Sequence, residues 1–148
     1  MNGLDIPPIW LAAFMVLAWV VARLVPGLAF NLPWQGIIAL VLLVAGLMLM
    51  AAAIYEMTRA NTTFVPRRDP GALVTSGVFR LTRNPIYLGD ALVLTSTVLW
   101  LNSGVGLVLV PVFAWVIRRR FINAEEATLK SKYAAQFDDW AKKTRRWV

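Results

Sequence analysis

Two residue types that carry much of enzyme chemistry are missing from this chain of 148 residues, which has no cysteine and no histidine. The absence of cysteine excludes disulfides, thiolate nucleophiles and cysteine metal sites. The absence of histidine excludes Ser-His-Asp hydrolysis, histidine-bound zinc or haem, and acid–base catalysis by imidazole. We therefore expect no metal site. Any chemistry must come from carboxylates, guanidinium groups, amines, aromatic rings and the backbone.

Charged residues are also scarce, at 16% of the chain against 59% hydrophobic residues. A soluble domain carries about 25% charged and about 45–50% apolar residues. The apolar surplus is too large for one globular core, so the composition predicts a membrane protein. The length allows one domain and no separate catalytic module. We expect a single all-α, membrane-embedded domain over residues 1–148.

Four apolar segments have the character of membrane helices, over residues 7–25, 34–55, 85–101 and 104–119. The clearest lies within residues 36–55, which carry no charge. A helix of about twenty residues, at about 1.5 Å per residue, crosses the hydrocarbon core of about 30 Å. We expect a tight turn at residues 102–104 between the last two segments and a kink at Pro111 in the fourth.

The basic residues give the four segments an orientation. The chain has 15 Lys and Arg against 8 Asp and Glu, and a net charge of +7. Four spans place every basic residue except Arg23 on one side, which the positive-inside rule makes cytoplasmic. We therefore expect an integral protein of a bacterial inner membrane with both termini in the cytoplasm. Topology and contact with membrane lipids account for the positive charge, so we expect no nucleic-acid partner.

Two cytoplasmic segments follow from this arrangement. The loop over residues 58–84 is longer than a connector requires. Residues 121–143 show helical periodicity, with apolar side chains at Phe121, Leu129, Tyr133, Phe137 and Ala141. This pattern predicts an amphipathic helix that continues from the fourth span. It would lie on the membrane or on the cytoplasmic face of the protein itself.

The junction between the loop and the third span is a candidate binding site. Asn84 and Pro85 fit the N-cap and first position of a helix. The free N–H groups of that helix end and the guanidinium of Arg83 would together bind an anion. Tyr87, on the first turn, offers an aromatic face for a base or a cation. The alternative is a capped helix with an Arg and a Tyr at the membrane interface.

Three acidic residues are further candidates. Glu125 falls on the apolar stripe of the C-terminal helix, so we expect it to face the protein. Glu126 has Lys130 four residues on, the spacing of a surface ion pair. A solvated acidic turn remains the alternative for both. Asp90 is the acid well inside an apolar span, which indicates either a functional carboxylate or an ion pair with a residue such as Arg83.

At these residues the chain resembles the isoprenylcysteine carboxyl methyltransferase family and the related phospholipid N-methyltransferases, over about residues 62–147. The first matching motif is Leu73-Val74-Thr75-Ser76-Gly77-Val78-Phe79-Arg80. The second is Arg83-Asn84-Pro85-Ile86-Tyr87-Leu88-Gly89. The third runs from Arg120-Phe121-Ile122-Asn123-Ala124-Glu125-Glu126 through Leu129 and Tyr133 to Arg145-Arg146-Trp147. The first two spans match only as hydrophobic helices.

The resemblance implies an S-adenosylmethionine pocket between the third and fourth spans, closed by the C-terminal helix. It places Arg83, Asn84, Tyr87 and Leu88 in that pocket. It also implies that Glu125 and Glu126 hold the amino end of the cofactor, and that Arg120 orients the acceptor. Relatives that act on prenylated proteins have His where Asn84 stands, whereas many bacterial-type relatives have Asn. Asn84 can hydrogen-bond a ligand but cannot titrate near pH 7.

The leading hypothesis is a membrane methyltransferase that acts on a lipophilic or lipid-anchored acceptor, with a carboxylate as the expected methyl acceptor. A carboxylate needs no base because it is ionised at neutral pH. A lipid amine or thiol is the alternative within the family, and Asp90 or Glu125 would then be the available base. From other classes, a small four-helix exporter that couples protons through Asp90 and a membrane scaffold subunit remain alternatives.

Overall fold

The computed structural model describes residues 5–25, 29, 32–63 and 70–148, and every regular element in these ranges is helical. Three long helices come first: α1 (Pro7–Leu24), α2 (Gln35–Arg59) and α3 (Pro85–Trp100). The 3₁₀ helix η2 (Gly77–Arg80) precedes α3. The chain then runs through η3 (Val105–Val108), α4 (Leu109–Ile117), the π-helix η4 (Arg118–Ile122) and α5 (Asn123–Lys143). Helices therefore occur in the four predicted apolar segments, and the predicted C-terminal segment is also helical, with an interruption at Ala134.

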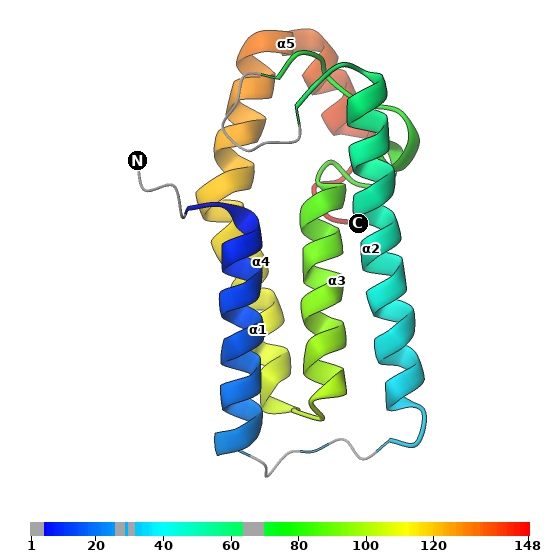
Figure 1. Ribbon diagram of the computed structural model, residues 1–148. Helices are drawn as coiled ribbons and strands as arrows, with labels where there is room; N and C mark the ends of the chain where they lie inside the picture. The colour runs from blue at the N-terminus through cyan, green and yellow to red at the C-terminus, as the bar shows by residue number, and fades with distance from the viewer. Residues whose placement is uncertain (1–4, 26–28, 30–31, 64–69) are drawn as a thin grey trace.

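The long helices lie side by side, with α3 between α2 and the pair formed by α1 and α4 (Figure 1). Of the described helices, α1 and α2 are long and apolar enough to cross a membrane. Helix α3 is also apolar but has 16 residues. Large apolar side chains remain exposed on the flanks of α1 and α2, among them Val16, Leu24, Ile37 and Met48. Exposed apolar surface of this extent is typical of contact with lipid or a partner rather than with water.

The turn between α3 and η3 forms as expected, because Asn102 takes the left-handed conformation with φ 54°. Pro111, the position of the predicted kink, lies within one turn of a change in helix geometry. Pro111 falls in the first turn of α4, directly after the 3₁₀ helix η3. The departure from α-helical geometry therefore precedes the proline, in a part of the helix where a missing N–H costs little.

Helix α5 continues from α4 through η4 and then folds back over the end of the bundle (Figure 1). The reversal occurs at Ala134, whose φ of 30° interrupts the helical backbone. It carries Phe137 and Trp140 into a buried cluster with Val74 and Phe79. Trp140 Nε1 also donates a hydrogen bond of 2.9 Å to the carbonyl oxygen of Phe79. Val74 and Phe79, which precede α3, are thus packed against the second half of α5.

Helices α2 and α3 approach each other closely at two glycines. A Cβ added at Gly46 would lie 2.8 Å from the carbonyl oxygen of Gly89, and one added at Gly89 would lie 2.8 Å from that of Gly46. Small residues allow this kind of close backbone packing between helices in membranes. The contact fixes α3, and therefore the residues at its start, against α2.

We expect Gly46→Ala to lower the free energy of unfolding by about 1–3 kcal/mol, because the added methyl group meets a backbone atom that cannot rotate away. Gly36→Ala is the matched control, since nothing lies within 4 Å of a Cβ at that position. Thermal unfolding in detergent micelles should show a lower midpoint for the first variant alone. Equal midpoints would mean that the glycine contact does not hold α2 against α3.

Candidate functional site

The start of α3 is held by the C-terminal tail of the chain. The backbone N–H of Arg83 donates to the carbonyl oxygen of Arg145 at 2.9 Å. The side chains of Thr82 and Asn84 both donate to the carbonyl oxygen of Arg146, each at 3.1 Å. Asn84 occupies the N-cap position of α3, but its side chain makes no capping hydrogen bond. The predicted N-cap position of Asn84 is therefore confirmed, but its side-chain amide binds the tail rather than the end of the helix.

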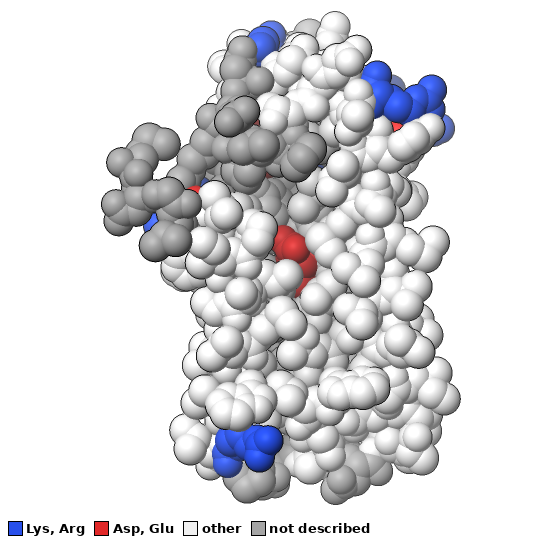
Figure 2. All heavy atoms as spheres, in the orientation of Figure 1, with Lys and Arg blue, Asp and Glu red and all other residues white. Residues whose placement is uncertain are grey.

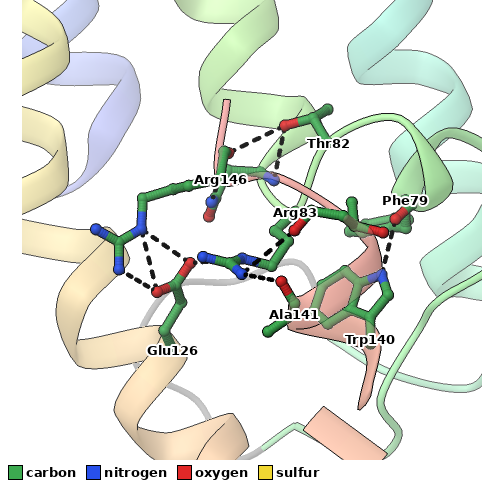
Figure 3. Close-up of polar contacts among 9 residues, drawn as sticks. Phe79, Thr82, Arg83, Glu126, Trp140, Ala141 and Arg146 are labelled. Atoms are coloured by element: carbon green, nitrogen blue, oxygen red, sulfur yellow. Dashed lines mark hydrogen bonds and ion pairs between the residues drawn. The ribbon is translucent and has the colours of Figure 1, made fainter. Parts of the chain in front are cut away.

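A carboxylate between two guanidinium groups completes this junction (Figure 3). Glu126, near the start of α5, accepts a hydrogen bond from Arg83 Nε at 3.2 Å and is bound by Arg146 from the other side. Arg83 Nη1 also donates to the carbonyl oxygens of Ala141 and Thr144, at 3.2 and 3.3 Å. One ion triad therefore joins α3, both halves of α5 and the tail.

The triad sets the charge state of its members. Burial opposes ionisation of Glu126, but the hydrogen bond from Arg146 and the charges of Arg83 and Arg146 outweigh it and hold the pKa of Glu126 below its ordinary value. The same hydrogen bond raises the pKa of Arg146. The Glu126 side chain is 13% exposed, so these charges are largely shielded from water. Glu126 is thus a fixed anion at neutral pH.

Glu125 has a different neighbour. Tyr87 Oη donates a hydrogen bond of 2.7 Å to Glu125 Oε1, and the Tyr87 ring stacks on Phe121 at 6.4 Å. Tyr87 is buried, whereas Glu125 is half-buried. This pair links the first turn of α3 to the start of α5 and places a carboxylate beside an aromatic ring.

Arg83, Asn84, Tyr87, Glu125 and Glu126 line a cavity of about 820 Å³. Its apolar wall includes Met50 and Ile54 from α2, Leu73 and Val74 from the loop, and Trp140 from α5. Figure 2 shows acidic atoms in a hollow near the middle of one face, in front of the upper part of α3 and between α1 and α2, whereas the basic atoms of this face lie toward its two ends. Ligand pockets of about 300–1,000 Å³ with an apolar lining and a few polar groups are the usual form of a small-molecule site.

The cavity brings together most of the residues predicted as a site. Those that line it are Arg83, Asn84, Tyr87, Asp90, Glu125 and Glu126. Leu88 and Arg120 are not among its lining residues. Leu88 follows Tyr87 on α3 and is half-buried. Arg120 instead forms an ion pair with Asp5, with 3.1 Å between Nη2 and Oδ2.

Asp90 is 6% exposed and lines the cavity. Its alternative role as an ion-pair partner of Arg83 is not observed, because Arg83 pairs with Glu126. In the described part of the chain no salt bridge involves Asp90. A carboxylate in this position can interact with a cation inside the cavity.

The surface pair predicted for Glu126 is wrong. Lys130 pairs with Asp138, at 3.1 Å, and Glu126 turns inward. Both acids of the Glu-Glu pair therefore face the site. Arg146 was not among the residues predicted for the site, although it stands in a matching motif, because a non-helical tail has no periodicity that shows which way a side chain points.

The model of one protein family, described as phospholipid methyltransferase, matches residues 34–136. The match covers more than half of the chain and includes the cavity residues of α2, α3 and the start of α5. The chain belongs to the phospholipid methyltransferase family. The resemblance seen in its motifs is thereby confirmed, and the family indicates a membrane-associated methyltransferase rather than an exporter or a scaffold. Neither the curated proteins nor the solved structures give a significant match.

We expect Glu126→Gln to lower the free energy of unfolding at pH 7 by about 1–3 kcal/mol, because two guanidinium groups lose their anionic partner. The folded pKa of Glu126 lies below its ordinary value of 4.5, so its contribution is fully present above that pH. It is lost as pH falls through the folded pKa. The gap between wild type and variant should therefore close in acid, as measured by denaturant unfolding at several pH values.

Asp139→Asn is the control for this experiment, because Asp139 pairs with Lys142 and is 70% exposed. It should leave stability unchanged within error. A gap for Glu126→Gln that persists unchanged into acid would show that the triad is not held by the charge of Glu126.

Proposed function

We propose that this chain is an integral membrane methyltransferase that uses S-adenosylmethionine to methylate the amine of a lipid. The observation that carries the proposal is the composition of the cavity. Three carboxylates, those of Asp90, Glu125 and Glu126, line it against a single guanidinium, that of Arg83, among the described residues. Arg83 is already neutralised by Glu126. The remaining negative charge favours ligands that carry positive charge.

The proposed topology has four spans, formed by α1, α2, α3 and the segment from η3 through α4. Both termini then lie in the cytoplasm of a bacterial cell, and α5 covers the cytoplasmic end. Arginines stack on aromatic rings near the ends of three of these segments: Arg23 on Trp19, Arg59 on Tyr55 and Arg119 on Trp115. Such pairs suit the membrane–water interface, where both side chains are favoured. These pairs support membrane spans that begin and end near the arginines.

The residues of the cavity fit S-adenosylmethionine. Its amino group is a cation, for which Glu125 supplies an anion, and its carboxylate is an anion, for which Arg83 supplies a donor. The hydroxyl of Thr62, a cavity residue, is buried without a hydrogen-bond partner in the described structure. The apolar walls near Leu73 and Trp140 suit a nucleoside ring. Bound there, the cofactor supplies an electrophilic methyl group.

The geometry favours an amine over the carboxylate expected from the sequence. An anionic acceptor needs a cation beside it, and Arg120, the candidate for that role, does not line the cavity. An ammonium group must lose a proton before its nitrogen can form a bond to carbon. Asp90 is buried in the cavity wall and can accept that proton. The apolar walls exclude water, which would otherwise compete with the acceptor.

Glu125→Gln should weaken S-adenosylmethionine binding about tenfold to a hundredfold, because it removes a charge-assisted contact to a cationic group. Tyr87→Phe should weaken it less, since it removes only the hydroxyl that orients Glu125. Isothermal titration with S-adenosylmethionine measures both. Glu56→Gln is the control, because Glu56 accepts a hydrogen bond from Ser76 and does not line this cavity. Wild-type affinity in a folded Glu125→Gln variant would remove Glu125 from the cofactor site.

The pH dependence of turnover tests the acceptor. For an amine, kcat should rise from pH 6 to 9 because the neutral, nucleophilic form becomes more abundant. Asp90→Asn should lower kcat by about 10²-fold or more, the usual contribution of a positioned base, while cofactor affinity changes little. Asp138→Asn, at an exposed surface pair, should behave as wild type. A flat profile above pH 6 with an active Asp90→Asn variant would point to a carboxylate acceptor instead.

A further inference from the structure

Three exposed tryptophans lie at the end of the bundle that is extracytoplasmic in the proposed topology. Trp19 near the end of α1, Trp34 directly before α2 and Trp100 at the end of α3 are 50%, 54% and 70% exposed. These helix ends lie together at the lower end of the bundle in Figure 1. Tryptophan is enriched at the membrane–water interface, where its ring lies at the level of the headgroups. The three side chains therefore define one common level from which the helices rise.

From this level, α1 and α2 reach unequal heights. Along α2, about 33 Å separate Trp34 from Glu56, at about 1.5 Å per residue. Along α1, only about 18 Å separate Trp19 from Pro7, where the helix begins. Figure 1 shows the same difference, because α2 reaches further toward α5 than the start of α1 does. Helix α2 thus matches a hydrocarbon core of about 30 Å, whereas α1 is shorter than that core by about 10 Å.

The polar level beside α1 and α4 is fixed by side chains that hold one another. Arg120 Nη2 lies 3.1 Å from Asp5 Oδ2, and Trp10 Nε1 donates to Asp5 Oδ1 at 3.0 Å. An ion pair at the lipid-facing surface does not lie in hydrocarbon, so the hydrocarbon ends at this level. The neighbouring span agrees, because the uncharged residues 104–117 rise about 23 Å, with 1.5 Å per α-helical and 2.0 Å per 3₁₀ residue.

The cavity lies at the step between these two heights. On the α1 side it is lined by Ile6 and Pro7, which follow the ion-paired Asp5 directly. On the α2 side it is lined by Met50 and Ile54, which precede the polar end of that helix. Figure 2 shows the hollow open between the two helices. One side of the opening therefore borders the polar level, and the other borders apolar surface.

We propose that the chain fits a bilayer whose hydrocarbon core is thinner beside α1 and α4 than beside α2, and that the partner it suits best is a bilayer of short-chain lipids. An apolar surface shorter than the bilayer draws the surrounding lipids into a thinner layer. The headgroups beside α1 then lie at the level of the cavity. A headgroup amine reaches Asp90 while the acyl chains stay in the bilayer, a consequence that rests on the proposed function, whereas the mismatch itself rests on the topology alone.

The dependence of stability on acyl-chain length tests the mismatch. The purified chain is placed in nanodiscs of monounsaturated phosphatidylcholine with 14, 16, 18, 20 or 22 carbons per chain, without cofactor, and its thermal midpoint is followed by near-UV circular dichroism. The midpoint should be highest with 14 or 16 carbons and about 3–10 °C lower with 22, because the cost of mismatch grows with every ångström. A highest midpoint at 18 carbons or more, or equal midpoints throughout, would overturn the proposal.

A matched pair of double variants assigns the mismatch to the short side. Arg118 and Arg119 are exposed and do not line the cavity. Replacing both with leucine adds about 3 Å of apolar height beside α4. This variant should lose about a quarter to a half less of its midpoint in 22-carbon lipid than the wild type loses. Replacing both with glutamine removes the same charges but keeps the level polar, so the wild-type dependence should remain. Equal behaviour of the two variants would contradict the assignment.

A depth reporter tests the step directly, because the natural chain has no cysteine. Ile9 and Val44 each lie ten residues from the tryptophan of their own helix, and they are 39% and 46% exposed. Bimane on Ile9→Cys should be quenched by aqueous iodide several-fold more strongly than bimane on Val44→Cys, in 18-carbon bilayers. Equal quenching would mean a flat interface and would overturn the proposal. Because no step requires turnover, a failure here is distinct from a failure of the methyltransferase assignment.

Discussion

The ion triad of Arg83, Glu126 and Arg146 is the interaction on which the rest of the site depends. It joins the start of α3 to both ends of α5, and the backbone of the tail pairs with the same junction. Removing one partner of a largely buried pair leaves the other charge uncompensated, which costs more than the intact pair contributes. The triad is therefore better understood as a device for fixing geometry. It sets where α5 begins, and hence where Glu125 meets Tyr87.

The cavity has a polar end and an apolar side, because the triad lies at one end of it. The end beneath α5 carries the carboxyl groups of Glu125 and Glu126, while the residues that α1 and α2 contribute to the lining are apolar. In the proposed mechanism, a charged cofactor reaches the first and a lipid reaches the second. The Gly46–Gly89 contact keeps α3 close to α2, so Tyr87 and Asp90 project into the cavity from one helix of fixed position.

Much of this could be predicted from sequence, for identifiable reasons. Apolar length predicted the helices, and the Asn84-Pro85 pair predicted the start of α3, because both depend on local chemistry. The sequence predicted a surface position for Glu126 because helical periodicity depends only on the spacing of residues within one helix. The observed partners of Glu126, Arg83 and Arg146, come from the loop and the tail. The reversal at Ala134 carries no glycine or proline signal, and it decides which residues α5 buries. Leu88 and Arg120 were predicted as site residues from the motif resemblance. A motif does not show which neighbour of a binding residue faces the ligand.

The central claim is that this cavity transfers a methyl group to a lipid amine. The most direct measurement supplies S-adenosylmethionine with an isotopically labelled methyl group to the purified chain in bilayers that contain phosphatidylethanolamine, followed by mass spectrometry of the extracted lipid. The account predicts label on the headgroup nitrogen, and none when bilayers of phosphatidylglycerol replace the amine lipid. Label found as a methyl ester, or no label with a cofactor-bound protein, would contradict it.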